Sequence, residues 1–485
     1  MRMNKELIHK FTRMALVVLM GGMTTTSCIF TADNAAINGE ATDDVANGGK
    51  AIIVLSDIHV VAPELVNTEN TDDGTNEPKL LQYSAEILEQ VVGNALKAKP
   101  DLVLITGDLT EGGDLASHKQ VVSTLSKLRT EGIKVAVIPG NHDINHGTTP
   151  TTPQQFAELY KDMGYDMAYA KDEASLSYVC EPFDGLVLLC IDTATGSIAD
   201  ASLAWLLDEA DKAREKGKQV VALQHHNLVE HYDGHSTLQT RYILNNYEEV
   251  GKKMMKHGIH LVMTGHTHVN DIAQYKTEAD SLIDLETGSL LAYPNAWRNI
   301  KVNSNFTKWD VSTEYVKQIP SVADVQKLSY QLYMNHLPSI VKNNADVLWP
   351  TLDGHRSMLT EAELSENIIP TTIEEFREWF AAGMSEKMCQ TFMMHFEGNE
   401  GKNPKAVALV DEVREQLVGM FSKRLAEYNA PEEKTAALTL FVGAYYDEIF
   451  KPIMESMLTD TNQLKEPKNK SVTDDLNTVL RLGRK

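Results

Sequence analysis

Five apolar runs in this 485-residue chain each end in a short polar motif, and this pattern limits the folds that the chain can adopt. The runs are AIIVLS, DLVLIT, VAVIP, QVVALQ and IHLVMT. Continuous apolar runs of this kind are typical of strands that are buried on both faces of a sheet. The polar motifs should therefore gather at the carboxyl ends of adjacent strands, where open α/β sheets bind ligands.

The motifs contain the side chains that hold metal ions in hydrolytic enzymes. They are Asp57-Ile58-His59, Gly107-Asp108, Gly140-Asn141-His142-Asp143, His225-His226 and Gly265-His266-Thr267-His268. Residues i and i+2 of an extended segment point the same way, so Asp57 and His59 can bind one ion. His266 and His268 can reach a site from the opposite side, and the two oxygens of Asp108 can bridge two cations. Oxygen donors combined with imidazoles predict a dinuclear metal site that hydrolyses phosphate esters.

In order and content the motifs resemble the calcineurin-like metallophosphoesterase superfamily, whose signature is DxH, GD, GNHD, H and GHxH. The resemblance covers about residues 49–315. It implies an α/β fold, a four-layer αββα sandwich, with two divalent or trivalent metal ions (Mn, Fe or Zn) between the sheets. It also implies that one ion is held by Asp57, His59, Asp108 and His268, and the other by Asp108, Asn141, His225 and His266.

The fourth motif leaves an ambiguity, because the superfamily usually has a proline where this chain has Asn227. Either adjacent histidine could be the ligand; His225 is preferred and His226 is the alternative. The resemblance implies that His142 is a non-ligand histidine beside the phosphate, as a hydrogen-bond donor or general acid. Asp143 either orients His142 or is a turn residue that makes local backbone bonds.

Longer segments resemble secreted bacterial class III cyclic-nucleotide phosphodiesterases. These segments are LTEGGDLASH (109–118), GNHDIN (140–145), HHNLVEH (225–231) and GSLLAYPNAWR (288–298). Those enzymes also carry a helical C-terminal domain. The resemblance implies that a metal-bridging hydroxide hydrolyses a phosphodiester, with a 3',5'-cyclic nucleotide as the expected substrate. The alternatives are a phosphomonoesterase, another phosphodiesterase, or a surface binding protein without catalysis.

The N-terminus predicts export. A basic segment, MRMNKELIHKFTR, precedes an apolar stretch of signal-peptide length that is too short to span a bilayer. Small residues before Cys28 resemble the lipobox of a bacterial lipoprotein, although Thr25 replaces the usual leucine. We therefore expect a signal peptide over 1–28, a flexible tether over 29–48, and a cell-envelope protein attached to the membrane only through a lipid on Cys28. A plain signal peptide is the alternative.

Periodicity predicts the remaining organisation. A catalytic domain over 49–318 should contain helices at about 81–98, 117–130 and 202–217. The segments 281–294, 298–302 and 309–316 should form an antiparallel meander that completes the second sheet. Helical spacing then predicts an all-α domain over 319–465, with Asn403-Pro404 beginning one helix and a break near Pro452. Residues 466–485 are expected to be a polar tail without regular structure.

Charge and isolated residues give further expectations. The net charge of −23 argues against a nucleic-acid polymer as a partner, because the phosphates would be repelled. A small phosphate ester is still acceptable, because bound cations reverse the local field. Cys180 and Cys190 flank an expected hairpin and should be core residues rather than a disulfide. His231 and His235 are expected to be solvated, and residues 60–79 to form a mobile acidic loop.

Overall fold

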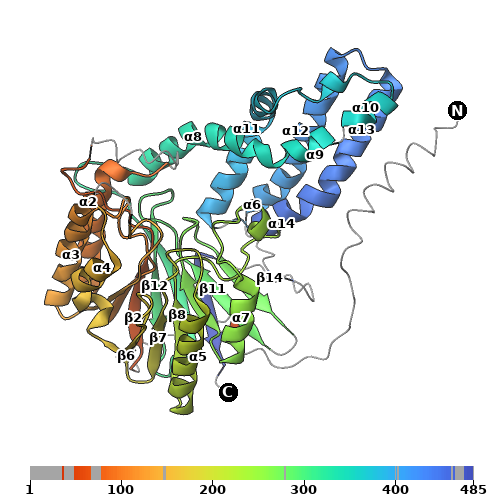
Figure 1. Cartoon of the computed structure of the whole chain (residues 1–485). Helices are drawn as coiled ribbons and strands as arrows, with labels where there is room; N and C mark the ends of the chain where they lie inside the picture. Colours follow the sequence, from red (N-terminus) through yellow and green to blue (C-terminus); the bar gives the residue numbers. More distant parts are fainter. Residues whose placement is uncertain are drawn as a thin grey trace.

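The computed structural model describes two stacked sheets, the helices that cover them, and a separate helical domain (Figure 1). The described residues are 35–37, 48–66, 78–145, 149–277, 280–354, 356–398, 400, 403–459, 463–464 and 475–483. The predicted signal peptide, Cys28 and most of the predicted tether lie outside these residues. Among the described helices, none combines the length and the apolar character needed to cross a membrane.

The first sheet carries the first three motifs at the ends of its parallel strands. Its strand order is β1-β15-β13-β12-β2-β3-β4. The parallel strands are β2 (Lys50–Leu55), β3 (Leu102–Ile105) and β4 (Lys134–Val137). The antiparallel strands are β12 (Ala296–Val302), β13 (Lys308–Tyr315), β15 (Asn477–Leu482) and β1 (Ala35–Ile37). Helices α2 (Ser84–Ala98) and α3 (Leu115–Thr130) pack against its outer face, as predicted.

The second sheet carries the last two motifs. Its strand order is β14-β10-β11-β9-β8-β7-β6-β5. The strands are β5 (Ala168–Lys171), β6 (Tyr178–Phe183), β7 (Leu186–Cys190), β8 (Gln219–Leu223), β9 (Leu261–Thr264), β10 (Ile272–Lys276), β11 (Ser281–Glu286) and β14 (Gln463–Leu464). Its outer face is covered by α5 (Asp200–Glu215) and α7 (Tyr247–Lys256). Two short helices, α4 (Pro153–Leu159) and α6 (His235–Leu238), lie in connecting segments.

Alternating residues of the second sheet pack on different layers. Cys180 and Leu188 belong to the core between the two sheets, whereas Val179 and Val187 pack against the helices outside. Such alternation follows from the two-residue repeat of a strand. The predicted αββα sandwich is therefore confirmed. Cys180 and Cys190 are buried free cysteines on the predicted hairpin, also as expected.

The predicted meander is confirmed in part: β12 and β13 pair antiparallel, but they do not complete the second sheet. Residues 281–286 form β11 of the second sheet, but β12 and β13 belong to the first sheet, where β12 pairs antiparallel with β2. The intervening segment crosses between the sheets, and Ser289 bridges to Ser56 on the way. Strand β2 has β3 on one side only, so its other edge needs a partner. The apolar pattern of β12 cannot specify which sheet it will join.

The helical domain follows β13. Its helices are α8 (Val325–Asn344), α9 (Trp349–Gly354), α10 (Arg356–Glu361), α11 (Ile373–Glu397), α12 (Pro404–Glu427), α13 (Glu432–Tyr445) and α14 (Lys451–Thr459). The side chain of Asn403 caps α12 by accepting a hydrogen bond from Lys405 N at 3.1 Å, as predicted. A π-helical turn at Tyr446–Phe450 separates α13 from α14 just before Pro452, where a break was expected.

Both ends of the chain were expected to lack regular structure, and this is wrong for residues 35–37 and 477–482. Strand β15 pairs antiparallel with β13, and β1 pairs with β15. Val479, Leu480 and Leu482 of β15 are buried. This short apolar segment was not recognised as a strand because the residues around it are mostly polar. The helical domain is consequently inserted into the sandwich, between strand β13 and the strands β14 and β15.

Candidate metal centre

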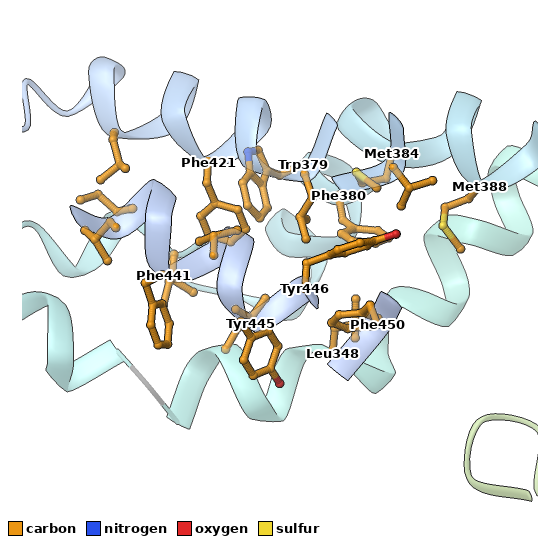
Figure 2. A pocket seen from close by; sticks show the side chains of 18 of the residues that line it. Leu348, Trp379, Phe380, Met384, Met388, Phe421, Phe441, Tyr445, Tyr446 and Phe450 are labelled. Atoms are coloured by element: carbon orange, nitrogen blue, oxygen red, sulfur yellow. The ribbon is translucent and has the colours of Figure 1, made fainter. Parts of the chain in front are cut away.

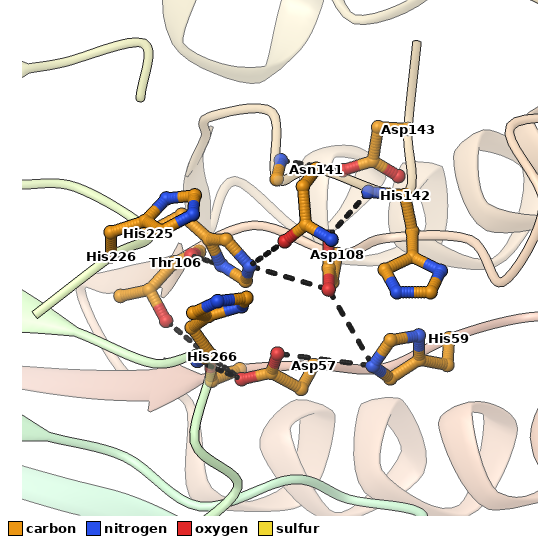
Figure 3. A network of polar contacts seen from close by, with 12 residues as sticks. Asp57, His59, Thr106, Asp108, Asn141, His142, Asp143, His225, His226 and His266 are labelled. Carbon is orange, nitrogen blue, oxygen red and sulfur yellow. Dashed lines mark hydrogen bonds and ion pairs between the residues drawn. The ribbon is translucent and has the colours of Figure 1, made fainter. Parts of the chain in front are cut away.

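The polar motifs converge where the strand ends of the two sheets face each other (Figure 3). Their backbone is not extended there. The φ angles of Asp57, His59, Asp108, His266 and His268 lie between 35° and 80°. Residues with a side chain rarely adopt this left-handed conformation, and such strain is concentrated at functional sites. Left-handed turns, rather than the extended geometry assumed from the sequence, direct these side chains inward.

Asp57, His59 and His268 form one group with the geometry of a metal site. Asp57 Oδ1 lies 3.4 Å from His268 Nε2 and 3.8 Å from His59 Nε2, and the two nitrogens are 3.1 Å apart. Within the described residues, Asp57 Oδ1 is buried and accepts no hydrogen bond. Its charge therefore faces only the imidazoles. A buried carboxylate oxygen in this position fits a cation ligand.

Asp108, His225 and His266 form a second group. His225 Nε2 lies 3.3 Å from Asp108 Oδ2 and 3.0 Å from Asn141 Oδ1. Asp108 Oδ2 is also 3.7 Å from His59 Nε2 in the first group. One carboxylate thus lies between two sets of ligand atoms, which is the arrangement that a pair of bridged cations needs.

The two histidines of the fourth motif have different surroundings. His225 faces Asp108 and Asn141, as described above, whereas His226 Nδ1 lies 3.3 Å from Thr193 Oγ1. The His226 ring packs at 4.2 Å, between ring centroids, on the ring of His266. Adjacent residues point in different directions here, and the geometry favours His225 as the residue that faces a metal ion.

One ring nitrogen of each of several histidines is held by an oxygen that can only accept a hydrogen bond. The hydrogen-bonded pairs are His225 Nδ1 with Thr106 O at 2.8 Å and His266 Nε2 with Arg241 O at 3.1 Å, and His59 Nδ1 makes an ion-pair contact with Glu111 Oε2 at 2.8 Å. The proton of a neutral ring is then on that nitrogen, and the other nitrogen keeps its lone pair. Metal-binding histidines are usually fixed in this way. The residues therefore fit a dinuclear metal centre.

The charges of the site stabilise one another. Burial alone would raise the pKa of Asp108, but His225 and His142 hold it well below its usual value. Burial lowers the pKa of His225, but the carboxylates of Asp108 and Asp57 and the hydrogen bond to Thr106 O together raise it to about 9. A metal ion at this position competes with that proton, because only the neutral imidazole can bind it.

His142 and Asp143 have separate tasks. His142 N donates to Asp108 Oδ1 at 2.9 Å, and its Nδ1 lies 2.7 Å from the backbone oxygen of Glu111. Burial lowers the pKa of His142, but the charges of Asp108 and Glu111 and the hydrogen bond to the Glu111 backbone together raise it, so the net shift is upward. The Asp143 carboxylate accepts backbone hydrogen bonds at 2.8 Å from Gly140 and at 2.9 Å from Thr110. The bond from Gly140 is local, whereas the bond from Thr110 joins the loop of Asp143 to the loop that follows β3.

The sequence did not reveal the role of Glu111. This carboxylate is 3% exposed and lies 2.8 Å from His59 Nδ1 and 2.9 Å from Lys79 Nζ. Burial raises its pKa, but the charges of His59 and Lys79 lower it below the usual value. Lys79 is buried, so the expected mobile loop over 60–79 is wrong at this residue; residues 67–77 lie outside the described part. The position of Glu111, three residues after Asp108, was the available signal.

His231 and His235 are buried, and the expectation that they are solvated is wrong. His231 lies among carboxylates, 3.4 Å from Asp271 and 3.6 Å from Glu286. Glu286 accepts a hydrogen bond from Thr267 N, between the two histidines of the fifth motif, at 3.2 Å. Burial raises the pKa of Glu286 to about 8. This buried network supports the loop that carries His266 and His268.

Known proteins resemble the sandwich part of the chain. Residues 50–270 match the family model of the calcineurin-like phosphoesterases. A cAMP/cGMP dual specificity phosphodiesterase of Mycobacterium tuberculosis is 24% identical over 46% of this chain and 63% of its own length. A probable glycerophosphodiester phosphodiesterase of Arcobacter nitrofigilis is 29% identical over 32% of this chain and 56% of its own. This chain thus spans less than two thirds of the length of either relative.

A solved dimetal phosphatase from Danio rerio is similar over 54% of this chain and 95% of its own, with 13% identity and a TM-score of 0.41. The family match covers all of the residues that were predicted to bind the two ions, from Asp57 to His268. The same motifs suggested the family, and that resemblance is confirmed. Residues 50–270 of this chain therefore form a calcineurin-like metallophosphoesterase domain.

Proposed function

We propose that the protein is a metal-dependent phosphodiesterase that acts on a small diester, with a 3',5'-cyclic nucleotide as the first candidate. The observation that carries this proposal is the Asp108 carboxylate, which lies between two groups of ligand atoms. One ion would be bound by Asp57, His59, Asp108 and His268, and the other by Asp108, Asn141, His225 and His266. Two metal ions bound in this way would supply hydroxide near neutral pH and would offset the charge of the phosphoryl oxygens.

His142 would supply a proton or a hydrogen bond. Its Nδ1 is fixed on the backbone oxygen of Glu111, so its Nε2 is the nitrogen left for the substrate. Burial lowers the pKa of His142, but Asp108 and Glu111 together raise it above its usual value, which favours the protonated ring. His142 could then donate to a phosphoryl oxygen or protonate the leaving alkoxide.

The relatives support a diester rather than a monoester. One is named for cyclic nucleotides and the other for glycerophosphodiesters, and both of these are phosphodiesters. The test is a substrate panel on protein reloaded with Mn, Fe or Zn: cyclic AMP, cyclic GMP, glycerophosphocholine and the nitrophenyl mono- and diesters. We expect kcat/KM to be highest for a cyclic nucleotide. A monoester that is hydrolysed faster than every diester would reject the proposal.

Substitutions test the ligand set. Asp108→Asn should lower metal content and turnover together, because it removes a charge that both ions would share. His225→Ala should lose one metal equivalent, while His226→Ala should retain both, since only His225 faces Asp108 and Asn141. Metal content is measured by plasma emission spectroscopy on the purified variants. Loss of the ion in His226→Ala alone would move the ligand to that residue.

We also propose that the protein is exported and anchored through a lipid on Cys28. The basic and apolar N-terminal segments and the small residues before Cys28 support this proposal. Cells supplied with labelled palmitate should label the parent protein, and Cys28→Ser should abolish the label. A labelled Cys28→Ser protein, or an unlabelled parent, would contradict the lipid anchor.

A further inference from the structure

A cavity of about 190 Å³ lies inside the helical domain (Figure 2). It is lined by side chains of α11, α12 and α13, by segments around α9 and α10, and by the π-helical turn and α14, and it is partly open. Its wall is almost entirely carbon and includes Trp379, Phe380, Met384, Val413, Leu417 and Phe441. The interior of a helical domain is normally closely packed, so a space of this size needs an explanation.

The apolar interior of the domain is divided in two. One cluster contains Phe380 and Val413, and a separate cluster contains Leu359, Ile368 and Leu425. All of these residues also line the cavity. The cavity is therefore the gap between two packed clusters rather than a small defect inside one of them. Protein interiors rarely leave such gaps, because close packing is the rule.

Helix α13 forms one wall without being well buried. Its apolar residues Leu438, Phe441, Val442 and Tyr445 line the cavity, yet each is only half-buried. Gly443 is the buried residue of this helix. The apolar side chains of α13 thus make fewer packing contacts than they would in a filled core. A ligand in the cavity would supply the missing contacts.

The wall offers little to a polar ligand. The Tyr446 hydroxyl is already used, since it donates to Val410 O at 2.7 Å. An apolar cavity of about 150 Å³ stays dry and accepts small apolar molecules. This cavity is larger and is similar in its chemistry, so water is a poor occupant of it.

We propose that this cavity binds the unbranched acyl chain of a lipid or fatty acid. Figure 2 shows the lining side chains in a row, with Phe441 toward one end and Met388 toward the other. A long row of apolar groups suits a chain better than a compact ring. Met384 and Met388 can adapt to its path, because unbranched thioether side chains fill irregular gaps. The polar end of the ligand would remain beside α13, where the wall is half-exposed.

Binding is tested on the full chain with cis-parinaric acid, a fluorescent acyl-chain probe, at concentrations below those at which the probe aggregates. The parent should bind one probe per protein. Val413→Phe fills the cavity and should weaken binding at least tenfold, with phosphoesterase activity unchanged. Val407→Phe is the matched control, because Val407 lies on the same helix, is 61% exposed and is not part of the wall. This control should bind as the parent does.

Position is tested separately, so that the result does not depend on one variant. Trp379 lines the cavity and should transfer excitation energy to the bound probe, and Trp379→Phe should lower this transfer. If Val413→Phe fails to fold, Val442→Phe on α13 replaces it. The proposal is overturned if the parent does not bind the probe, if a folded filled variant binds it equally well, or if Trp379→Phe leaves the energy transfer unchanged.

Discussion

Glu111 connects the metal centre to the surrounding protein, and it yields the first prediction. Glu111→Gln keeps the shape of the side chain but removes the charge that holds His59 Nδ1 and Lys79 Nζ. Metal affinity or kcat/KM should fall about 10- to 100-fold, the usual cost of losing such a partner. Metal titration and steady-state kinetics measure both. The control is Glu131→Gln, at an exposed residue; parental affinity and activity in Glu111→Gln would contradict this role.

The second prediction separates proton transfer from metal binding. His142 donates its backbone N–H to Asp108, but its ring is held by the backbone oxygen of Glu111. His142→Ala should therefore keep its metal content and lose roughly 10²- to 10⁴-fold in kcat, the range for a general acid. Metal content and turnover are measured on the same sample. A variant that lost one metal equivalent would show that His142 is a ligand.

Individual residues also show where sequence reasoning stops. Asp57, His59 and Asp108 could be selected because each follows a buried strand within a motif of fixed spacing. Glu111 and His231 belong to no such pattern. Their roles depend on partners such as Lys79 and Glu286, which only the folded chain brings close. Apart from the position of Glu111, three residues after Asp108, the sequence contains no signal for these contacts.

At the scale of elements, α3 is joined to the third motif through a buried histidine. His118 Nε2 lies 2.8 Å from Asp143 O, and its Nδ1 lies 2.8 Å from the Tyr160 hydroxyl. The carbonyl oxygen can only accept, so Nε2 carries the proton of the neutral ring. Burial lowers the pKa of His118 below its usual 6.5. Its contribution to stability is then complete above pH 6.5 and is lost as the pH falls toward the folded-state pKa.

The third prediction follows from this sign. His118→Gln should lower stability at pH 8 by about 1–3 kcal/mol, because a buried group loses a partner. The variant should also lose less stability than the parent between pH 7 and pH 5, since its side chain does not titrate. Thermal unfolding at several pH values measures both effects. An equally steep loss of Tm in parent and variant would contradict the argument.

The sheet to which a strand belongs could be predicted only where its neighbouring strands could also be predicted. The parallel strands that precede the motifs were identified from their apolar runs, and the helices between them from their periodicity. β12 and β13 were recognised as strands but assigned to the wrong sheet. The apolar pattern of a strand predicts that it is buried. Which of the two sheets it joins depends on contacts in the folded chain.

At the scale of the whole molecule, the last strand closes the edge of the catalytic sheet. The fourth prediction is that deletion of residues 476–485 lowers Tm and promotes association, because β13 loses its partner and exposes an unpaired edge. Deletion of residues 484–485 alone, beyond β15, is the control. Thermal unfolding and light scattering measure the two effects. A monomeric deletion variant with the parental Tm would show that β15 is dispensable.

The insertion of the helical domain has a consequence for synthesis. Strand β13 ends at Tyr315, but its partner β15 begins only at Asn477. At about 5–20 residues per second, the roughly 160 intervening residues take on the order of 10–30 s to emerge. During that time the helical domain can fold as a unit while the sheet next to it is incomplete. The edge of β13 therefore lacks its partner until β15 has emerged, and it must be protected from other chains until then.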